Sequence, residues 1–139
     1  MSVPSIGPVT ATAVVATVDD VTRFASAHQF EAFLGVVPSE HSSGDKRRLG
    51  AITKAGNLRV RVLLVEAAWR ILRSPKHESA ALREWARCIA ERRGRRIAVV
   101  ALARRLAGVL YAVWRDGQPF KATKVRRPRA RANRSVAAA

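Results

Sequence analysis

The chain has 139 residues, of which 26 are Lys or Arg and 10 are Asp or Glu, giving a formal net charge of +16 and an isoelectric point near 11.8. With 48% hydrophobic residues it is too apolar for a fully disordered protein, and its length suits one core. Its single cysteine, Cys88, excludes an internal disulfide and a multi-cysteine metal site, and we expect it to be buried on a helix face.

Residues 3 to 18 predict a turn followed by a helix of small residues. Pro8 suits the first helical turn. The run Ser5-Ile6-Gly7-Pro8 is similar to the second half of a helix-hairpin-helix motif, in which hairpin amides and a helix N-terminus meet a DNA phosphate. Gly7 is therefore a candidate nucleic-acid-binding residue. The alternative is a capped helix without a ligand.

The next segment predicts a short helix from Val21 to Leu34. Asp19-Asp20 should end the preceding helix, with Asp20 capping the new one. Three phenylalanines recur at helical spacing in this segment, so we expect them in the core and not as stacking platforms for bases. They are Phe24, Phe30 and Phe33.

Residues 35 to 57 predict a surface loop. The segment reads GVVPSEHSSGDKRRLGAITKAGN, with four glycines, one proline and no apolar period across its first half. We predict no strand pair here or elsewhere in the chain. Because hydroxyl, amide and cationic donors suit phosphate oxygens, this loop is the candidate functional element.

The remaining chain predicts three helices and a tail. The helices are expected at residues 57–74, 80–93 and 97–114, with stops at Ser74-Pro75, Gly94 and Gly117. Residues 121–139 carry seven cations and no acid, and we expect them to be disordered until they meet an anion. The predicted fold is mainly α: one small helical domain over residues 1–120, with a helix-hairpin-helix-like start and a functional loop, and a basic tail over residues 121–139.

The excess of cations predicts a polyanionic partner, and nucleic acid is the simplest. No apolar run reaches the roughly 20 residues of a membrane span, and no basic segment precedes the first apolar residues as in a signal peptide. We therefore expect a cytoplasmic, nucleoid-associated protein without a membrane partner. Binding of basic helices to a membrane surface is a weaker alternative.

The residues favour phosphate chemistry over other reactions. The ten acids show no repeated spacing that would build a two-metal site, so we expect no metal site in this chain. His41 directly precedes Ser42 and Ser43, and sequence neighbours rarely form a nucleophile and base pair. Ser43 precedes Gly44, which leaves the backbone open for a phosphate. Cations that could hold this phosphate follow closely: Lys46, Arg47, Arg48, Lys54, Arg59 and Arg61. The alternative is a pair of ordinary hydroxyls beside a solvated basic face.

Several blocks of this sequence resemble the C-terminal, serine-bearing domain of the bridge-RNA-guided insertion-sequence transposases. The similarity extends from residue 3 to residue 120. The blocks that carry it are Phe33–Pro38, Ser42–Gly44, Lys46–Gly50, Ile52–Asn57, Arg61, Leu63–Ala68, Ala98–Gly108 and Trp114–Phe120.

The resemblance implies a DNA strand-exchange enzyme whose serine links covalently to DNA. By the family pattern Ser43 is the nucleophile and Ser42 the fallback. The family's RuvC-like DEDD domain, which would supply Mg²⁺, has no counterpart here, so we expect a fragment, a decayed element or an internal-start product that is not active alone. Expected partners are DNA, a guide RNA, and further copies of the chain or a complementing DEDD-containing transposase. The alternative function is a non-catalytic DNA- or RNA-binding remnant.

Overall fold

The structure, a computed structural model, describes residues 3–43, 46–52 and 57–120; for residues 38–43 and 46–52 it describes the backbone only. The elements are α1 (Pro8–Val18), the 3₁₀ turn η1 (Val21–Arg23), α2 (Ala27–Phe33), β1 (Pro38–Ser43), β2 (Lys46–Ile52), α3 (Leu58–Arg73), the 3₁₀ turn η2 (His77–Ser79), α4 (Ala80–Arg93) and α5 (Arg95–Asp116). The predicted mainly α fold is confirmed. The predicted tail and Lys54 lie outside the described residues.

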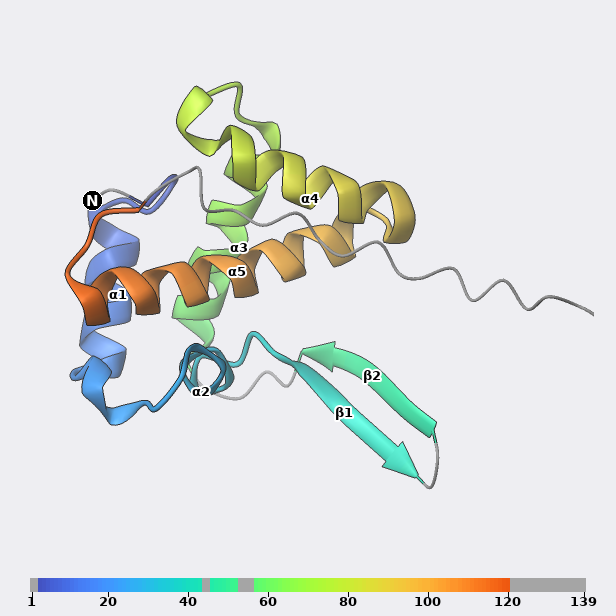
Figure 1. Ribbon diagram of the computed structural model, residues 1–139, viewed down its shortest axis with the longest axis horizontal. Coiled ribbons are helices and arrows are strands. Elements are labelled where there is room, and N and C mark those ends of the chain that lie inside the picture. The colour runs from blue at the N-terminus through green and yellow to red at the C-terminus, as the bar shows by residue number, and fades with distance from the viewer. Residues whose placement is uncertain (1–2, 44–45, 53–56, 121–139) are drawn as a thin grey trace, which may run out of the picture.

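The central element is α5, around which the other helices are arranged (Figure 1). It packs against α2, α3 and α4. Its buried face alternates small and large residues, which lets neighbouring helices approach closely: Ala98, Val99, Leu102, Ala103, Leu106, Ala107, Leu110 and Tyr111. By length and composition alone α5 could cross a membrane, although Arg104 and Arg105 interrupt its apolar run, and 44% of its apolar window is buried inside the protein. A core helix has these properties.

The boundaries of α3 follow from its flanking residues, as predicted. The Asn57 side chain accepts hydrogen bonds from the backbone amides of Arg59 and Val60, so it caps the first turn. Ser74-Pro75 follows the last turn. One stripe of α3 is buried: Val60, Leu64, Ala67, Ala68, Ile71 and Leu72.

The prediction of one helix from Val21 to Leu34 is wrong. Asp20 caps only the turn η1, by accepting hydrogen bonds from the backbone amide and hydroxyl of Thr22. A new helix, α2, begins after Ser26, whose hydroxyl accepts from the Gln29 amide while the Gln29 side chain accepts from the Ala25 amide. This reciprocal cap restarts the helix.

Of the three phenylalanines expected in the core, Phe30 is buried there, and Phe24 and Phe33 are half-buried and pack against it. Phe24 contacts Phe30 and Phe33, with ring centroids 5.4 and 5.3 Å apart. Phe30 is fully buried and also contacts Tyr111 of α5 at 5.5 Å. Cys88, expected to be buried, is half-buried on α4 with a free thiol.

The prediction that residues 35 to 57 form a loop without strands is also wrong. β1 and β2 form an antiparallel hairpin that extends from the helical body (Figure 1). Only two residues, Gly44-Asp45, separate the strands, and a Gly-Asp pair is a hairpin connection by sequence. Because β1 reads Pro-Ser-Glu-His-Ser-Ser, without apolar alternation, the usual strand signal is missing.

Candidate nucleic-acid interface

The hairpin brings together the two candidate nucleophiles and three candidate phosphate ligands. Its backbone register pairs Ser43 with Lys46, Ser42 with Arg47, and His41 with Arg48. All of these pairs lie at the end of the hairpin that is farthest from the helical body. The register therefore concentrates both serines and three cations within three successive residue pairs.

The base of the hairpin is anchored in the core. Gly35 ends α2 with φ of 75°, a left-handed conformation that glycine adopts without strain. Val36 and Val37, which lead into β1, are 1% and 8% exposed. The Val36 amide donates to the Glu31 carbonyl at 3.2 Å. The hairpin therefore starts from a segment that is packed and hydrogen-bonded in the helical body.

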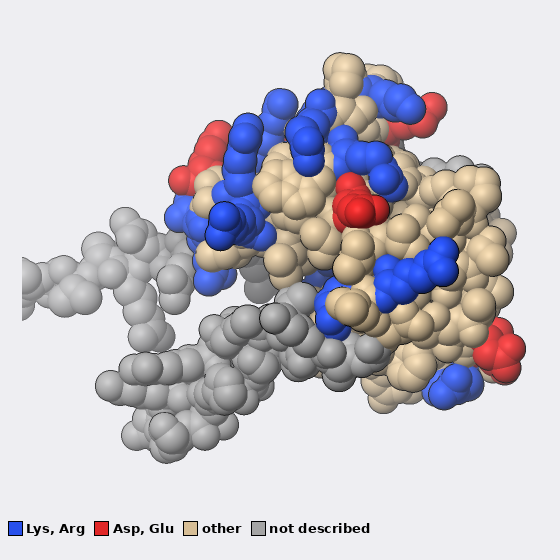
Figure 2. Space-filling view, turned by 180° about the vertical axis from the view of Figure 1, so that it is seen from behind, with Lys and Arg blue, Asp and Glu red and all other residues tan. Residues whose placement is uncertain are grey.

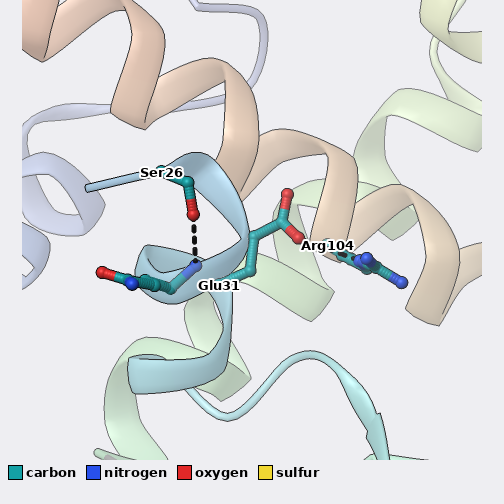
Figure 3. A network of polar contacts seen from close by, with 4 residues as sticks. Ser26, Glu31 and Arg104 are labelled. Atoms are coloured by element: carbon teal, nitrogen blue, oxygen red, sulfur yellow. Dashed lines mark hydrogen bonds and ion pairs between the residues drawn. The ribbon is translucent and has the colours of Figure 1, made fainter. Parts of the chain in front are cut away.

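That part of the helical body is held by an ion pair between α2 and α5. The Glu31 carboxylate, on a side chain that is 12% exposed, accepts from Arg104 Nε at 2.9 Å. Figure 3 shows the Glu31 side chain, on α2, directed toward Arg104 on α5, and Ser26 capping the start of α2. The other carboxylate oxygen lies beside Gly108, where a Cβ would be only 2.8 Å away. A glycine at position 108 therefore makes room for this carboxylate.

The first turn of α3 carries two further candidate ligands. Arg59 is exposed, whereas Arg61 is half-buried. Arg61 Nη1 is enclosed and has no hydrogen-bond partner among the residues that the structure describes. Leaving a charged donor without an acceptor is costly, and such groups often indicate an absent ligand. An oxygen of a bound anion would satisfy this donor.

Gly7 belongs to a different face from the hairpin. It immediately precedes α1, is exposed, and has no atom within 4 Å of the place a Cβ would take. A groove of about 550 Å³ lies between α1 and the start of α3, lined by residues that include Pro8, Thr12, Asn57 and Arg59. In Figure 1, α1 lies along the left edge of the helical body, whereas the hairpin extends from its lower side beside α2, with its tip directed away from α1. The candidate residues therefore do not form one continuous site.

The described side chains do not offer a metal site. Among them, no group of three or more His, Cys, Asp or Glu residues could hold an ion. The one carboxylate that is buried among the described residues, Glu31, is paired with Arg104. These residues do not fit the Mg²⁺ that the resemblance implies.

The sequence prediction of the site missed a set of arginines on α4 and α5. Figure 2 shows Lys and Arg side chains gathered over one part of the helical body. The sequence does contain a cluster of arginines here, Arg92-Arg93-Gly94-Arg95-Arg96, but it predicts from Gly94 only the end of a helix. The two helices reverse at Gly94, so these four arginines flank a single corner.

Comparison with known proteins identifies a family whose sequences this chain matches. The family described as "Transposase IS116/IS110/IS902 family" matches residues 1–85. The chain is 40% identical over 112 residues to the transposase for insertion sequence element IS1111A of Coxiella burnetii, which covers 81% of this chain and 31% of that protein. It is 31% identical over 120 residues to the transposase for insertion sequence element IS1328 of Yersinia enterocolitica, which covers 86% of this chain and 36% of that protein. The chain thus spans about a third of the length of these curated relatives.

Proposed function

The chain belongs to the IS116/IS110/IS902 transposase family, and from this membership we propose that it is a DNA-binding transposase segment whose Ser43 attacks a DNA phosphate. The observation that carries the proposal is the hairpin register, which pairs Ser43 with Lys46 and Ser42 with Arg47. A hydroxyl-bearing residue paired with a cationic one in the backbone register suits phosphoryl transfer, because negative charge on the phosphate oxygens must be neutralised. DNA is the substrate of such a reaction, and the bacterial cytoplasm is where it would occur.

In the proposed step, the Ser43 hydroxyl oxygen attacks the phosphorus of one DNA linkage. A phosphoserine ester bond forms, and the bond from phosphorus to the oxygen of the departing strand breaks. The serine proton leaves to solvent or a base, and the departing oxygen takes up a proton to become a hydroxyl. Lys46, Arg47 and Arg48 would neutralise the phosphate oxygens, and Arg61 Nη1, which has no hydrogen-bond partner among the described residues, would donate to another phosphate of the same DNA.

The described side chains of this chain do not fit a metal ion. If Mg²⁺ takes part, another module must hold it, such as the DEDD domain that the resemblance implies. A serine hydroxyl needs activation to be an effective nucleophile. We therefore expect covalent chemistry only when that module is supplied.

The test is to trap the covalent product. The chain is incubated with a separately purified DEDD-containing domain and a DNA carrying a phosphorothiolate linkage, which prevents religation. We expect a protein–DNA adduct with wild type that Ser43→Ala abolishes and that Ser39→Ala, a matched change earlier in β1, preserves. If Ser43→Ala and Ser42→Ala both leave the yield unchanged, the nucleophile assignment fails.

A second candidate function is non-catalytic DNA binding. The observation that favours it is that the described part of the chain carries basic surface but no acidic cluster. It predicts salt-dependent DNA binding and no adduct under any complementation. The trapping experiment separates the two functions, because only the first gives a covalent product.

A further inference from the structure

The corner between α4 and α5 carries arginines that make no contacts that stabilise the described part of the fold. Between residues 82 and 105 the chain has eight arginines and two glutamates. Three of these arginines have structural roles: Arg83 donates to the Ser74 and Lys76 carbonyls, Arg104 pairs with Glu31, and Arg105 lies over the Trp85 ring at 5.3 Å. The remaining five are Arg87, Arg92, Arg93, Arg95 and Arg96.

The four arginines nearest the turn are exposed and have no partner in the described part of the chain. Arg92, Arg93, Arg95 and Arg96, called here the corner arginines, are all exposed. Within the described part of the chain, none of them makes an ion pair or a side-chain hydrogen bond, and the nearby Glu91 is equally unpaired. Four like charges within five residues repel one another, so folding alone gives no reason to place them together.

The corner holds these arginines in a fixed arrangement. Gly94 is the single residue between the helices and has φ of 91°, which favours glycine. Its amide donates to the Ala90 carbonyl at 2.9 Å, and its carbonyl accepts from the Ala98 amide at 3.2 Å. Ala98 and Val99, one turn into α5, are buried. The one-residue turn at Gly94, with its backbone hydrogen bonds and the buried residues after it, therefore holds the corner arginines close together.

We propose that the corner arginines are a second DNA-binding surface, which contacts the phosphate backbone of a duplex independently of the hairpin. Arginine is suited to phosphate because its planar fork makes two parallel hydrogen bonds. A duplex fits better than a single strand, since single-strand sites add aromatic platforms for bases. Here the nearby Trp85 is half-buried and covered by Arg105. The choice of DNA over another polyanion rests on the proposed function.

This surface also has a place in the architecture. In Figure 1 the hairpin and the α4–α5 corner project toward the same side of the molecule, away from α1. One DNA could therefore be held at the corner while a phosphate is presented to the hairpin. Contacts to backbone alone carry no sequence preference, so the surface would add affinity and orientation without specificity.

The test measures binding of the full 139-residue chain to a 30-base-pair DNA duplex over a range of KCl concentrations. Every protein carries Ser43→Ala, so no covalent chemistry contributes. Arg92→Gln, Arg93→Gln, Arg95→Gln and Arg96→Gln are combined in one variant; glutamine has nearly the helix propensity of arginine. The matched control removes four charges elsewhere, by Arg70→Gln, Arg73→Gln, Lys76→Gln and Arg115→Gln. Circular dichroism melting verifies that both variants fold.

Each phosphate contact contributes about 0.9 to the slope of log affinity against log salt concentration. We expect the corner variant to lose about two to four units of slope and at least about tenfold in affinity near 0.1 M salt, and the control to lose markedly less. Equal losses in both variants would overturn the proposal, because they would reflect net charge alone. A larger loss on an RNA duplex of the same sequence would overturn the choice of DNA. Failure of adduct trapping would leave this result untouched.

Discussion

Glu31 and Arg104 are joined by a hydrogen-bonded ion pair of 2.9 Å although 73 residues separate them in the sequence. Glu31 lies on α2, five residues before the valine that leads into β1, and Arg104 lies in the middle of α5. The pair therefore links the base of the hairpin to the central helix. We expect this ion pair to stabilise the fold and to fix the position at which the hairpin extends from the helices.

Replacing Glu31 should test this link. Glu31→Gln keeps the size of the side chain but removes the charge, and we expect the free energy of unfolding to fall by about 1–3 kcal/mol. The lower part of this range is favoured because the Arg104 side chain is 40% exposed and can be hydrated. Urea unfolding measures the effect, with the exposed Glu66→Gln as the matched control. Equal effects of the two changes would contradict a stabilising ion pair.

The effect of alanine at position 108 should depend on Glu31. A Cβ at position 108 would lie 2.8 Å from Glu31 Oε1, so the carboxylate must shift and its ion pair with Arg104 weakens. This loss should offset the better helix propensity of alanine, and we expect Gly108→Ala to lower the free energy of unfolding by no more than about 1 kcal/mol. In a Glu31→Ala background the clash is gone, and the same change should be neutral or stabilising by up to about 1 kcal/mol. A double-mutant cycle measures this coupling. Additive effects would show that the carboxylate does not occupy the space beside Gly108.

Tyr111 should contribute through its hydroxyl as well as its ring. The hydroxyl donates to the Phe24 carbonyl at 3.1 Å, across 87 residues. Tyr111→Phe keeps the contact with Phe30 but removes the donor, and we expect a loss of about 1 kcal/mol, seen as a lower urea midpoint with an unchanged slope. An unchanged midpoint would mean that the hydrogen bond makes no net contribution.

Asp20 should make stability depend on pH at the acidic end. The Thr22 hydroxyl, followed by the Thr22 backbone amide, donates to this carboxylate and lowers its pKa below the usual value. A lowered folded pKa means that the contribution is present above the unfolded pKa and is lost as pH falls through the folded one. Stability curves measured from about pH 5 downward should therefore fall less steeply for Asp20→Asn than for wild type. Parallel curves would contradict the assignment.

The helices could be predicted because their signals are local. Asn57 before an apolar stripe, Gly94 between two amphipathic runs and Gly117 after the last one gave the observed starts and stops to within a residue or two. The hairpin was missed because its strands lack apolar alternation. The break at Ser26 was missed because a continuous apolar period hid a serine cap.

The site could be predicted only in part, for a similar reason. The serines and the cations after them are neighbours in sequence, so their association was readable. The ion pair of Glu31 with Arg104, the space at Gly108 and the enclosed Arg61 Nη1 depend on contacts between distant segments, which no sequence period encodes. The sequence also could not show that Gly7 lies away from the hairpin.

The most direct measurement of the proposed function is to identify the residue that carries DNA. The trapped adduct, formed with the complementing DEDD-containing domain, is digested with nuclease and protease and sequenced by mass spectrometry. We predict a single nucleotide on Ser43, through a phosphate ester. A nucleotide on Ser42 would contradict the choice of Ser43, and a nucleotide anywhere outside this pair, or no adduct while strand transfer proceeds, would contradict the proposed chemistry as a whole.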